Sequence, residues 1–409
     1  MDEERYLVED YDVVIVGAGI GGLALGYALA SKGRQVCLLE AKHGVNPSKR
    51  GLTLQPNGLE ALQKLGLLDR VVRIGAKISR VTWREISGGL LATFDYSILD
   101  HPHNYLLTVL PSELELVLRD ALSDVGGTIY ESTFFREIRR TGLGRVELKA
   151  ERDGSPVEFS ARIIVGADGQ NSRVRQALKI PVRLKEYPDH FFFMLAGPIV
   201  SLRKEARQYL ARGRMVGFFP TLGSTYIFYY LPGRKVEEFR AQGFQSFKKE
   251  LASTEPELSD SLGQLGSWDD IAHSSNTRVD AANWVADQAA LLGDAVHALD
   301  PSWAQGANLA LQDAVALARR IETCFDLNDF SVNALKRYEE ERRQQAEFVQ
   351  NGAERTAQLT ATESRFYHWL GKRILVRTVR NRELIRVALR ASCGLTDRFT
   401  LWEKMKFLI

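Results

Sequence analysis

A glycine-rich turn near the N-terminus constrains the fold of this chain more than any other feature. The segment Gly17-Ala18-Gly19-Ile20-Gly21-Gly22 follows the apolar run at residues 13–16 and precedes a helical pattern over residues 23–30. An unbroken β-branched run that ends at glycine is typical of a buried parallel strand. The first glycine permits a tight turn, the second lets the backbone approach a pyrophosphate, and the last lets the helix lie close to the strand. The sequence therefore predicts a βαβ unit that binds a dinucleotide.

A carboxylate follows the second predicted strand at the distance that such a unit requires. Residues 35–39 form an apolar strand, and Glu40 ends it about 20 residues after the glycines. We expect its carboxylate to accept the hydrogen bonds of a ribose diol, while the helix N-terminus favours the phosphate charge. This part of the sequence leaves open whether the ligand is NAD or FAD. The residues predicted to contact it are Gly17, Gly19, Ile20, Gly21, Gly22 and Glu40.

The composition is that of an ordinary globular protein. The net charge of +3 over 409 residues gives no reason to expect a nucleic-acid partner. The three cysteines are odd in number and widely spaced, which favours reduced thiols over disulfides or a metal site. No apolar run approaches the roughly 18 residues of a membrane span, and the N-terminus lacks the apolar segment of a signal peptide. We expect a cytoplasmic protein that binds no metal.

The order of patterns along the chain predicts an α/β protein in which one domain interrupts another. Strands and helices typical of a Rossmann-like nucleotide-binding domain cover residues 1–75, 105–185 and 286–335. Short strands and amphipathic helices over residues 76–104 and 186–285 predict an inserted α+β substrate domain. Residues 336–409 are predicted to form a helical C-terminal region.

Two further motifs follow apolar runs later in the chain. The run at residues 161–166 leads into Gly166-Ala167-Asp168-Gly169, with Ser172 and Arg173 close behind. The run at residues 289–292 leads into Gly293-Asp294-Ala295-Val296-His297, then Pro301 and Gln305-Gly306-Ala307-Asn308. The last segment opens a helical pattern that extends to residue 322.

The three motifs, in this order over about residues 10–345, resemble those of the single-component FAD-dependent aromatic hydroxylases. That group includes p-hydroxybenzoate hydroxylase and the ubiquinone-pathway hydroxylases. The resemblance implies that the discontinuous domain binds FAD, with Asp294 at its ribityl and pyrophosphate part and Arg50 nearby. It also implies that the backbone of Gly306, Ala307 and Asn308 lies against the pyrimidine edge of the flavin. Reduced flavin is an anion there, and a helix N-terminus stabilises that charge.

Two residues of these motifs have a structural interpretation beside the functional one. Asp168 matches a motif that the family associates with FAD and with the approach of NAD(P)H, but it also precedes a helix that it can cap. The sequence does not separate the two roles. His297 is interpreted as a core histidine rather than a catalytic one.

Three positions depart from the family pattern. Pro111 stands where many relatives carry an arginine, so one FAD contact is either missing or moved to Arg119. Asp300 stands before Pro301 in place of proline or histidine, and Trp303 replaces a small residue. We expect Asp300 and Trp303 beside the flavin, where they reshape the oxygen pocket or slow turnover.

The resemblance implies a monooxygenase in which NAD(P)H reduces FAD and O2 forms a flavin C4a-hydroperoxide. Its distal oxygen is then delivered to an aromatic or polyprenyl-phenol substrate. The flavin makes the bond, so no catalytic nucleophile is expected. Pocket candidates are Asp300 and Pro301, together with one face of the aromatic strand at residues 226–230. Side chains alternate along a strand, so the pocket face holds either Tyr226, Phe228 and Tyr230 or else Ile227 and Tyr229, although such aromatics are more often core.

Alternative functions are a flavin-dependent prenyl reductase on the same scaffold, which needs no O2, and a non-catalytic FAD-binding sensor. Contact with a membrane surface is a further alternative, because residues 365–409 contain eleven Lys or Arg and three acidic residues. Gly371 interrupts this segment, and Arg373, Arg377 and Arg382 are predicted to spread around the helix. A helical cap with a solvated basic face is therefore the preferred interpretation.

Overall fold

The central sheet of the computed structural model, which describes residues 8–140 and 144–403, has eight strands with a parallel centre. Its order is β17-β18-β11-β1-β2-β8, and β10 and β9 extend it beside β11. β1 pairs in parallel with β2, as the predicted βαβ unit requires, and also pairs in parallel with β11 on its other side. The strands are β1 Val8–Val16, β2 Val36–Leu39, β8 Thr128–Tyr130, β9 Thr133–Arg140, β10 Val146–Arg152, β11 Ser155–Gly166, β17 Val285–Ala286 and β18 Ala289–Leu291.

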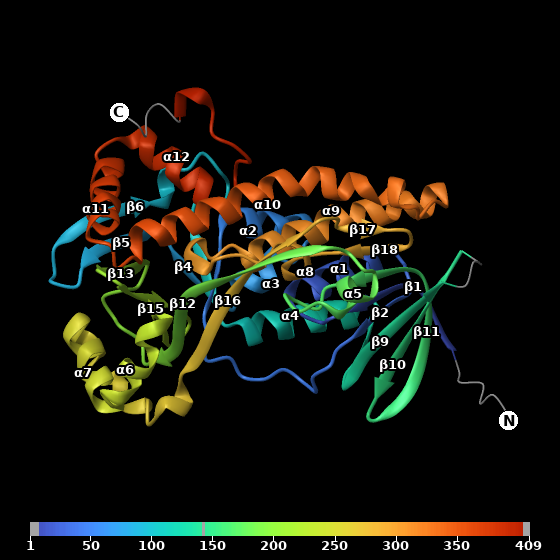
Figure 1. Cartoon of the computed structure of the whole chain (residues 1–409), viewed down its shortest axis with the longest axis horizontal. Coiled ribbons are helices and arrows are strands. Elements are labelled where there is room, and N and C mark those ends of the chain that lie inside the picture. Colours follow the sequence, from blue (N-terminus) through green and yellow to red (C-terminus); the bar gives the residue numbers. More distant parts are fainter. Residues whose placement is uncertain (1–7, 141–143, 404–409) are drawn as a thin grey trace.

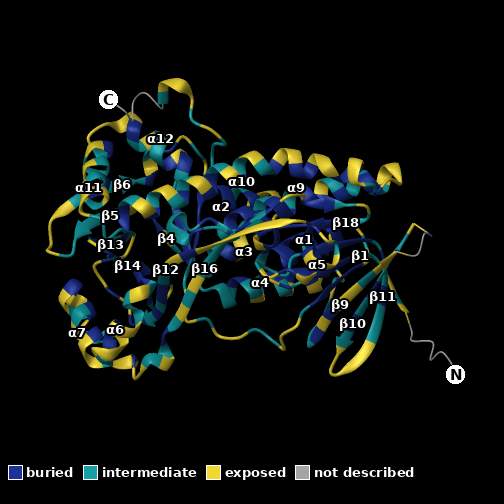
Figure 2. Ribbon diagram, viewed as in Figure 1, coloured by how far each residue is buried: buried dark blue, intermediate teal, exposed yellow. Residues whose placement is uncertain are grey.

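Helix α1 (Ile20–Ala30) lies close to this sheet because two glycines leave no room for side chains. Gly17 has φ +104°, and a Cβ there would lie 2.4 Å from the carbonyl oxygen of Ala167. A Cβ on Gly22 would lie 2.1 Å from the carbonyl oxygen of Gly17. Most residues of α1 and the strand residues 13–16 are buried, and they appear dark blue in Figure 2. The glycines therefore set the packing of helix on strand.

A second, mainly antiparallel sheet has seven strands in the order β16-β12-β15-β14-β13-β5-β6. One face packs against α6 (Val236–Ala241) and α7 (Phe244–Thr254), at the lower left of Figure 1. Amphipathic helices were predicted in this part of the chain, and Gly243 at φ +85° separates α6 from α7. The strands are β5 Arg80–Glu85, β6 Leu90–Asp95, β12 Val182–Ala196, β13 Glu205–Ala211, β14 Arg214–Pro220, β15 Thr225–Pro232 and β16 Ala272–Ala281.

A small three-stranded sheet pairs β7 (Leu106–Val109) with β3 (Leu52–Leu54) on one side and β4 (Ala76–Ile78) on the other. After β3 come two helices, α2 (Pro56–Lys64) and α3 (Leu68–Val72). Gly66 at φ +73° separates them. Helix α4 (Pro111–Asp124) follows β7 and contacts α1.

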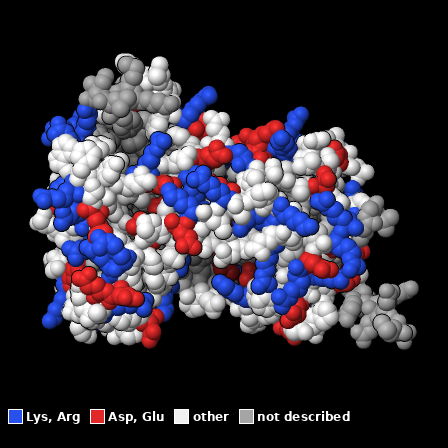
Figure 3. Space-filling view, viewed as in Figure 1, with Lys and Arg blue, Asp and Glu red and all other residues white. Residues whose placement is uncertain are grey.

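After residue 305, the described part of the chain forms the helices α9 (Gly306–Leu327), α10 (Val332–Thr360), α11 (Arg365–Val379) and α12 (Arg382–Ser392). α9 contacts α1 and α2, and the long α10 crosses from the eight-stranded sheet toward the seven-stranded one (Figure 1). Acidic and basic side chains mix over most of the visible face (Figure 3). Within residues 8–140 and 144–403, no helix has the length and apolar character needed to cross a membrane.

Candidate cofactor and substrate site

The carboxyl ends of β1, β2 and β11 meet at the glycine-rich turn. The amide of Gly17 donates to the carbonyl of Leu39 at 2.8 Å, and the amide of Ala167 donates to Val16 at 2.8 Å. Glu40 lies beside this turn, where its carboxylate accepts from the amides of Ala18 (2.8 Å) and Lys42 (2.9 Å). An ionised carboxylate has about four acceptor positions. Glu40 therefore has capacity left for hydroxyl donors.

The glycines of the turn have different surroundings. A Cβ on Gly19 would meet nothing within 4 Å, so open space lies in front of this residue. A Cβ on Gly21 would instead lie 2.6 Å from the side chain of Leu292, which explains Gly21 by packing alone. Ile20 is half-buried at the first position of α1. Gly19 is thus the glycine whose missing side chain leaves room for a ligand at the helix N-terminus.

Asp168 caps the short helix α5 (Arg173–Ala177). Its carboxylate accepts from the hydroxyl of Ser172 at 2.5 Å and from the amides of Arg173 (2.7 Å) and Val174 (3.1 Å). Ser172 in turn accepts from the amide of Arg175 at 3.0 Å. Burial raises the pKa of Asp168, although these hydrogen bonds oppose the rise. The capping interpretation therefore has direct geometric support.

Asp294 opens α8 (Asp294–His297) and lies beside the start of α9. Its side chain is exposed, and a Cβ on Gly306 would lie 3.8 Å from its Oδ1. The surrounding protein nevertheless raises the pKa of Asp294, and the charge of nearby Asp313 adds to the rise. The Asp294 carboxylate is thus open to solvent on one side, although protein atoms surround it closely. The first amides of α9, at Gly306, Ala307 and Asn308, have no acceptor within the helix.

The side chain of Asn308 holds the start of α9 against β3. It accepts from the amide of Gln55 at 2.9 Å and donates to the carbonyls of Thr53 (3.1 Å) and Ala304 (2.7 Å). The residue is fully buried, and these three hydrogen bonds occupy its side chain.

A cavity of about 320 Å³ lies between the loop at residues 46–50, the start of α4 and Ala272. Arg50 lines it, with its guanidinium carbon 5.2 Å from the ring centre of Phe193. Pro111 begins α4 on the opposite wall. Arg119, the suggested substitute for an arginine at position 111, is held by Glu115 (3.1 Å) and Glu131 (2.7 Å). Its Nη2 is buried and has no hydrogen-bond partner, so one donor remains available.

The aromatic strand β15 presents its two faces to different parts of the molecule. Tyr229 packs against Phe239 of α6, with ring centres 5.0 Å apart. Tyr226, Phe228 and Tyr230 lie on the opposite face, which is covered by residues of α11 and α12. The set Tyr226, Phe228 and Tyr230 therefore lies on the side of the sheet away from α6 and α7, and the set Ile227 and Tyr229 faces these helices. The first of these sets and neighbouring rings of β12 and β14 form one surface, the aromatic face, which consists of Phe191, Phe193, Phe219, Tyr226, Phe228 and Tyr230.

The aromatic face touches the loop that carries Arg50. A Cβ on Gly51 would lie 2.2 Å from the ring of Tyr226, so this glycine lets the loop lie directly on that ring. Burial raises the pKa of Tyr226 and Tyr230, and Tyr230 donates to the carbonyl of Ala361 at 2.6 Å. Both phenols therefore stay protonated at neutral pH. They form a wall rather than a base.

Asp300 and Pro301 lie at the turn before α9. Asp300 is buried, and its carboxylate accepts from the amide of Ser302 at 2.9 Å. Burial raises the pKa of Asp300 to about 6, against the opposing effect of the Ser302 hydrogen bonds. Pro301 begins the 3-10 turn that Asp300 caps.

The side chain of Trp303 points toward α10. Its indole packs on Gly352 of α10, where a Cβ would lie 2.0 Å from the ring, and its Nε1 donates to Thr356 at 2.9 Å. Its carbonyl accepts from the Gln55 side chain at 3.0 Å. The glycine at position 352 thus provides a slot in α10 for the indole, and the position of Trp303 beside the flavin stays a prediction.

Two polar residues behind the start of α9, Asn57 and Asp313, were given no role in the sequence analysis. His297 lies in the core, as interpreted, with Nε2 2.6 Å from the carboxylate of Asp313. Gln305 is buried and accepts from Asn57 at 2.9 Å, while its amide donates to the carbonyl of Ser392 at 2.8 Å. The sequence signal that could have identified Asp313 is a charged side chain among the apolar positions of the predicted helix.

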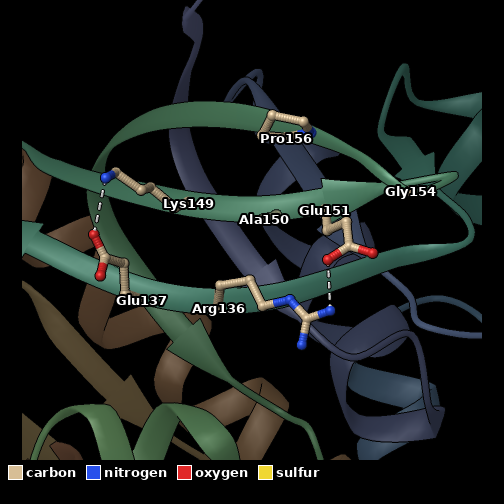
Figure 4. A pocket seen from close by; sticks show the side chains of 7 residues that line it. All are labelled: Arg136, Glu137, Lys149, Ala150, Glu151, Gly154 and Pro156. Atoms are coloured by element: carbon tan, nitrogen blue, oxygen red, sulfur yellow. Dashed lines mark hydrogen bonds and ion pairs between the residues drawn. The ribbon is translucent and has the colours of Figure 1, made fainter.

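A second hollow of about 290 Å³ lies away from these motifs, on β9, β10 and the start of β11 (Figure 4). The ion pairs Arg136–Glu151 (2.6 Å) and Lys149–Glu137 (3.1 Å) cross it. Its charged groups are thus paired with each other. It contains none of the predicted site residues.

Comparison with known proteins gives a consistent result. A family model described as FAD binding domain matches residues 10–353. The chain is 29% identical over 320 residues to 6-methylpretetramide 4-monooxygenase of Streptomyces rimosus, covering 75% of this chain and 73% of that protein. It is 27% identical over 401 residues to 2-heptyl-3-hydroxy-4(1H)-quinolone synthase of Pseudomonas aeruginosa, covering 94% and 98%.

Solved structures share the fold. The p-nitrophenol 4-monooxygenase of Pseudomonas putida superposes with a TM-score of 0.83 at 20% identity, covering 96% of this chain and all of that one. PqsL of P. aeruginosa, in complex with 2-aminobenzoylacetate, superposes with a TM-score of 0.78 at 24% identity, covering 88% and 100%. The predicted α/β fold class is thereby confirmed.

Proposed function

The chain belongs to the single-component FAD-dependent aromatic hydroxylases, and from this premise we propose that it uses NAD(P)H and O2 to hydroxylate an aromatic or polyprenyl-phenol substrate. The observation that carries this proposal is the contact of the loop that carries Arg50 and Gly51 with the aromatic face. Arg50 lies over Phe193, and Gly51 lies on Tyr226. A flavin held along the loop therefore has a wall of aromatic side chains next to it, as a flat apolar substrate requires.

We propose that FAD extends from the glycine-rich turn to the start of α9, and the residues present fit it. The open space before Gly19 suits a pyrophosphate, and Glu40 has acceptor capacity left for a ribose. The exposed carboxylate of Asp294 suits the ribityl hydroxyls. The residues assigned to FAD are Gly17, Gly19, Ile20, Gly21, Gly22, Glu40, Arg50, Asp168, Asp294, Gly306, Ala307 and Asn308, of which Gly17, Gly21 and Gly22 act through packing.

When bound, FAD supplies the activation of O2 and the transfer of oxygen. The protein contributes positioning and electrostatics. The free amides of Gly306, Ala307 and Asn308 stabilise negative charge at the adjacent ring edge. The aromatic face excludes water and orients the substrate ring, while Tyr226 and Tyr230 remain protonated. Asp300 and Pro301 are proposed as the part of the pocket wall nearest α9.

We also propose the division of the chain into a discontinuous FAD-binding domain, an inserted substrate domain and a helical C-terminal region. The seven-stranded sheet unites residues 80–95 with residues 182–281, which supports one inserted domain. β4 at Ala76–Ile78 pairs with β7 in the small sheet. The boundary is therefore proposed after residue 78 rather than at residue 76.

Anaerobic reduction of the bound flavin by NADPH or NADH, with and without a panel of phenols and quinone precursors, tests the proposal. Hydroxylation predicts that one compound class accelerates reduction and that admission of O2 yields a product heavier by one oxygen atom. A product with two added hydrogens and no need for O2 indicates the prenyl reductase. Reduction that no compound accelerates, with no product, favours the FAD-binding sensor.

A further inference from the structure

We propose that one face of α11 docks onto an anionic lipid bilayer. The face consists of Phe366, Trp369, Arg373, Arg377 and Arg380 and is called the α11 stripe below. All five side chains are exposed. Phe366 and Trp369 have exposed fractions of 61% and 51%, which are unusual for such large apolar side chains.

The stripe is a continuous surface because its members follow helical spacing. Successive members are three or four residues apart, so they lie above one another on one side of the helix. Gly371 and Thr378 are buried, on another side of the same helix. A Cβ on Gly371 would lie 2.2 Å from the carbonyl oxygen of Leu359 in α10, so this glycine lets α11 pack closely against α10.

These contacts correct the interpretation drawn from sequence. Gly371 does not interrupt the helix, because α11 runs without a break from Arg365 to Val379. Arg373 and Arg377 do not spread around it but share the stripe. Arg382 belongs to the next helix, α12. The basic residues of α11 are thus gathered beside exposed aromatic rings.

The charged side chains of the segment that carries the stripe have one sign, although Glu363 and Glu383 flank this segment. Residues 365–382 contain six Lys or Arg and no acidic side chain. One of these cations, Lys372, is paired with Glu85 on β5, away from the stripe. The guanidinium carbon of Arg373 lies 5.5 Å from the ring centre of Trp369, so charge and aromatic surface are contiguous. At the upper left of Figure 3, around α11 and α12, blue and white atoms predominate over red.

This combination fits a lipid surface of negative charge. Trp, Tyr and Phe are favoured at the level of the headgroups, and arginines are attracted to anionic lipids. Tyr367, with an exposed fraction of 52%, flanks the aromatic end of the stripe. The exposed side of one helix, such as α11, can lie flat on a bilayer, whereas a peptide or a nucleic acid strand is usually held in a groove. The observations therefore favour the membrane as the occupant.

The position of the stripe relates the bilayer to the aromatic face. Leu375 of α11 packs in one cluster with Phe191 and Tyr230, and Leu389 of α12 packs with Tyr226. α11 therefore contacts the membrane with one side and covers the aromatic face with another. A substrate that partitions into lipid would reach the protein next to this cover. The docking surface itself does not depend on which reaction the protein catalyses.

Co-sedimentation of the full-length FAD-loaded protein with vesicles tests the proposal. The probes are vesicles of phosphatidylcholine alone and vesicles with about a third of phosphatidylglycerol. We expect binding only to the second kind, and weaker binding at about 0.5 M salt than at about 0.1 M. Replacing both aromatics (Phe366→Ser with Trp369→Ser) should lower the partition coefficient about tenfold or more. Arg373→Glu with Arg377→Glu should lower it about a hundredfold.

A matched control comes from another exposed pair. Phe134 and Arg139 lie on β9, with Phe134 41% exposed and the Arg139 side chain 60% exposed. Phe134→Ser with Arg139→Glu should leave vesicle binding unchanged. Vesicles should also shift tryptophan emission to shorter wavelength, and Trp369→Phe should remove most of that shift.

Two outcomes would overturn the proposal. One is equal vesicle binding by the wild type and both stripe variants. The other is a lipid-free wild type that sedimentation velocity shows to be a dimer, with the stripe variants monomeric, because a second copy of the chain would then occupy this surface.

Discussion

Nε2 of His297 lies 2.6 Å from the carboxylate of Asp313, and Arg342 donates to the same carboxylate at 2.9 Å. Asp313 is completely buried and also accepts from the amide of Gly293 at 3.0 Å. One carboxylate thus joins the turn before Asp294 to α9 and α10. It holds the wall of the proposed cofactor site from behind.

The first prediction concerns stability against acid. Burial alone would raise the pKa of Asp313, but His297 and Arg342 outweigh it and lower the pKa to about 2. A carboxyl with a lowered pKa in the folded state stabilises the protein above its unfolded pKa. This contribution, about 2 kcal/mol, should be lost as the pH falls from about 4 to about 2. Urea unfolding across this range measures it.

Asp313→Asn should lower the free energy of unfolding at neutral pH by about 3–5 kcal/mol, because Arg342 then stays buried without its anion. The variant should also lose part of the pH dependence below about pH 4. Asp124→Asn, at an exposed carboxylate, serves as the control. Equal pH profiles of the wild type and Asp313→Asn would contradict the assignment.

The second prediction separates two glycines of the same turn. Gly19 has ordinary extended angles and open space around a Cβ, so Gly19→Ala should change the stability of the apoprotein by less than about 1 kcal/mol. It should weaken FAD binding about tenfold or more, because the methyl group occupies the space assigned to pyrophosphate. Gly22→Ala should destabilise the fold itself by about 1–3 kcal/mol, since the Cβ meets the Gly17 carbonyl. Flavin titration and urea unfolding of both variants give the comparison.

The third prediction contrasts two aspartates. Asp294→Asn should weaken FAD binding about tenfold and leave unfolding almost unchanged, because its exposed carboxylate is assigned to ligand hydroxyls. Asp168→Ala should lower the free energy of unfolding by about 1–2 kcal/mol, because three hydrogen bonds of the α5 cap are lost. Should Asp294→Asn bind FAD as tightly as the wild type, the proposed course of the cofactor fails.

The fourth prediction uses the slot for Trp303. Glycine to alanine inside a helix normally stabilises by about 1 kcal/mol. Gly352→Ala should instead destabilise by about 1–3 kcal/mol, because its Cβ would meet the indole. The same change in a Trp303→Ala background should recover the usual stabilisation. A double-mutant cycle by urea unfolding measures the coupling, and stabilisation by Gly352→Ala alone would place the indole elsewhere.

Much of the fold was predictable because its signals are local. The β-branched run at residues 13–16, the glycines after it and Glu40 each follow from strand and turn geometry over about 30 residues. Parallel pairing of β1 with β2 followed from them, whereas the pairing with β11 was seen only in the structure. The alternation in β15 also predicted which aromatic side chains share a face, although not which face lies away from α6 and α7.

Element boundaries were less predictable where a single glycine decides them. Gly243 separates α6 from α7 and Gly66 separates α2 from α3, because both glycines have positive φ. The amphipathic pattern continues across such a residue. Hydrophobic spacing alone therefore does not show the break.

The sequence by itself determined the dinucleotide-binding unit, the order of the three motifs and the family to which they point. Only the tertiary structure decided the direction of the Trp303 indole, the partners of Asp313 and which side of α11 is exposed. Each of these depends on a residue that lies far away in the chain or on a neighbouring helix, such as Gly352, Arg342 or Leu359. Local periodicity records which residues are apolar, whereas their partners are selected only when distant segments pack together.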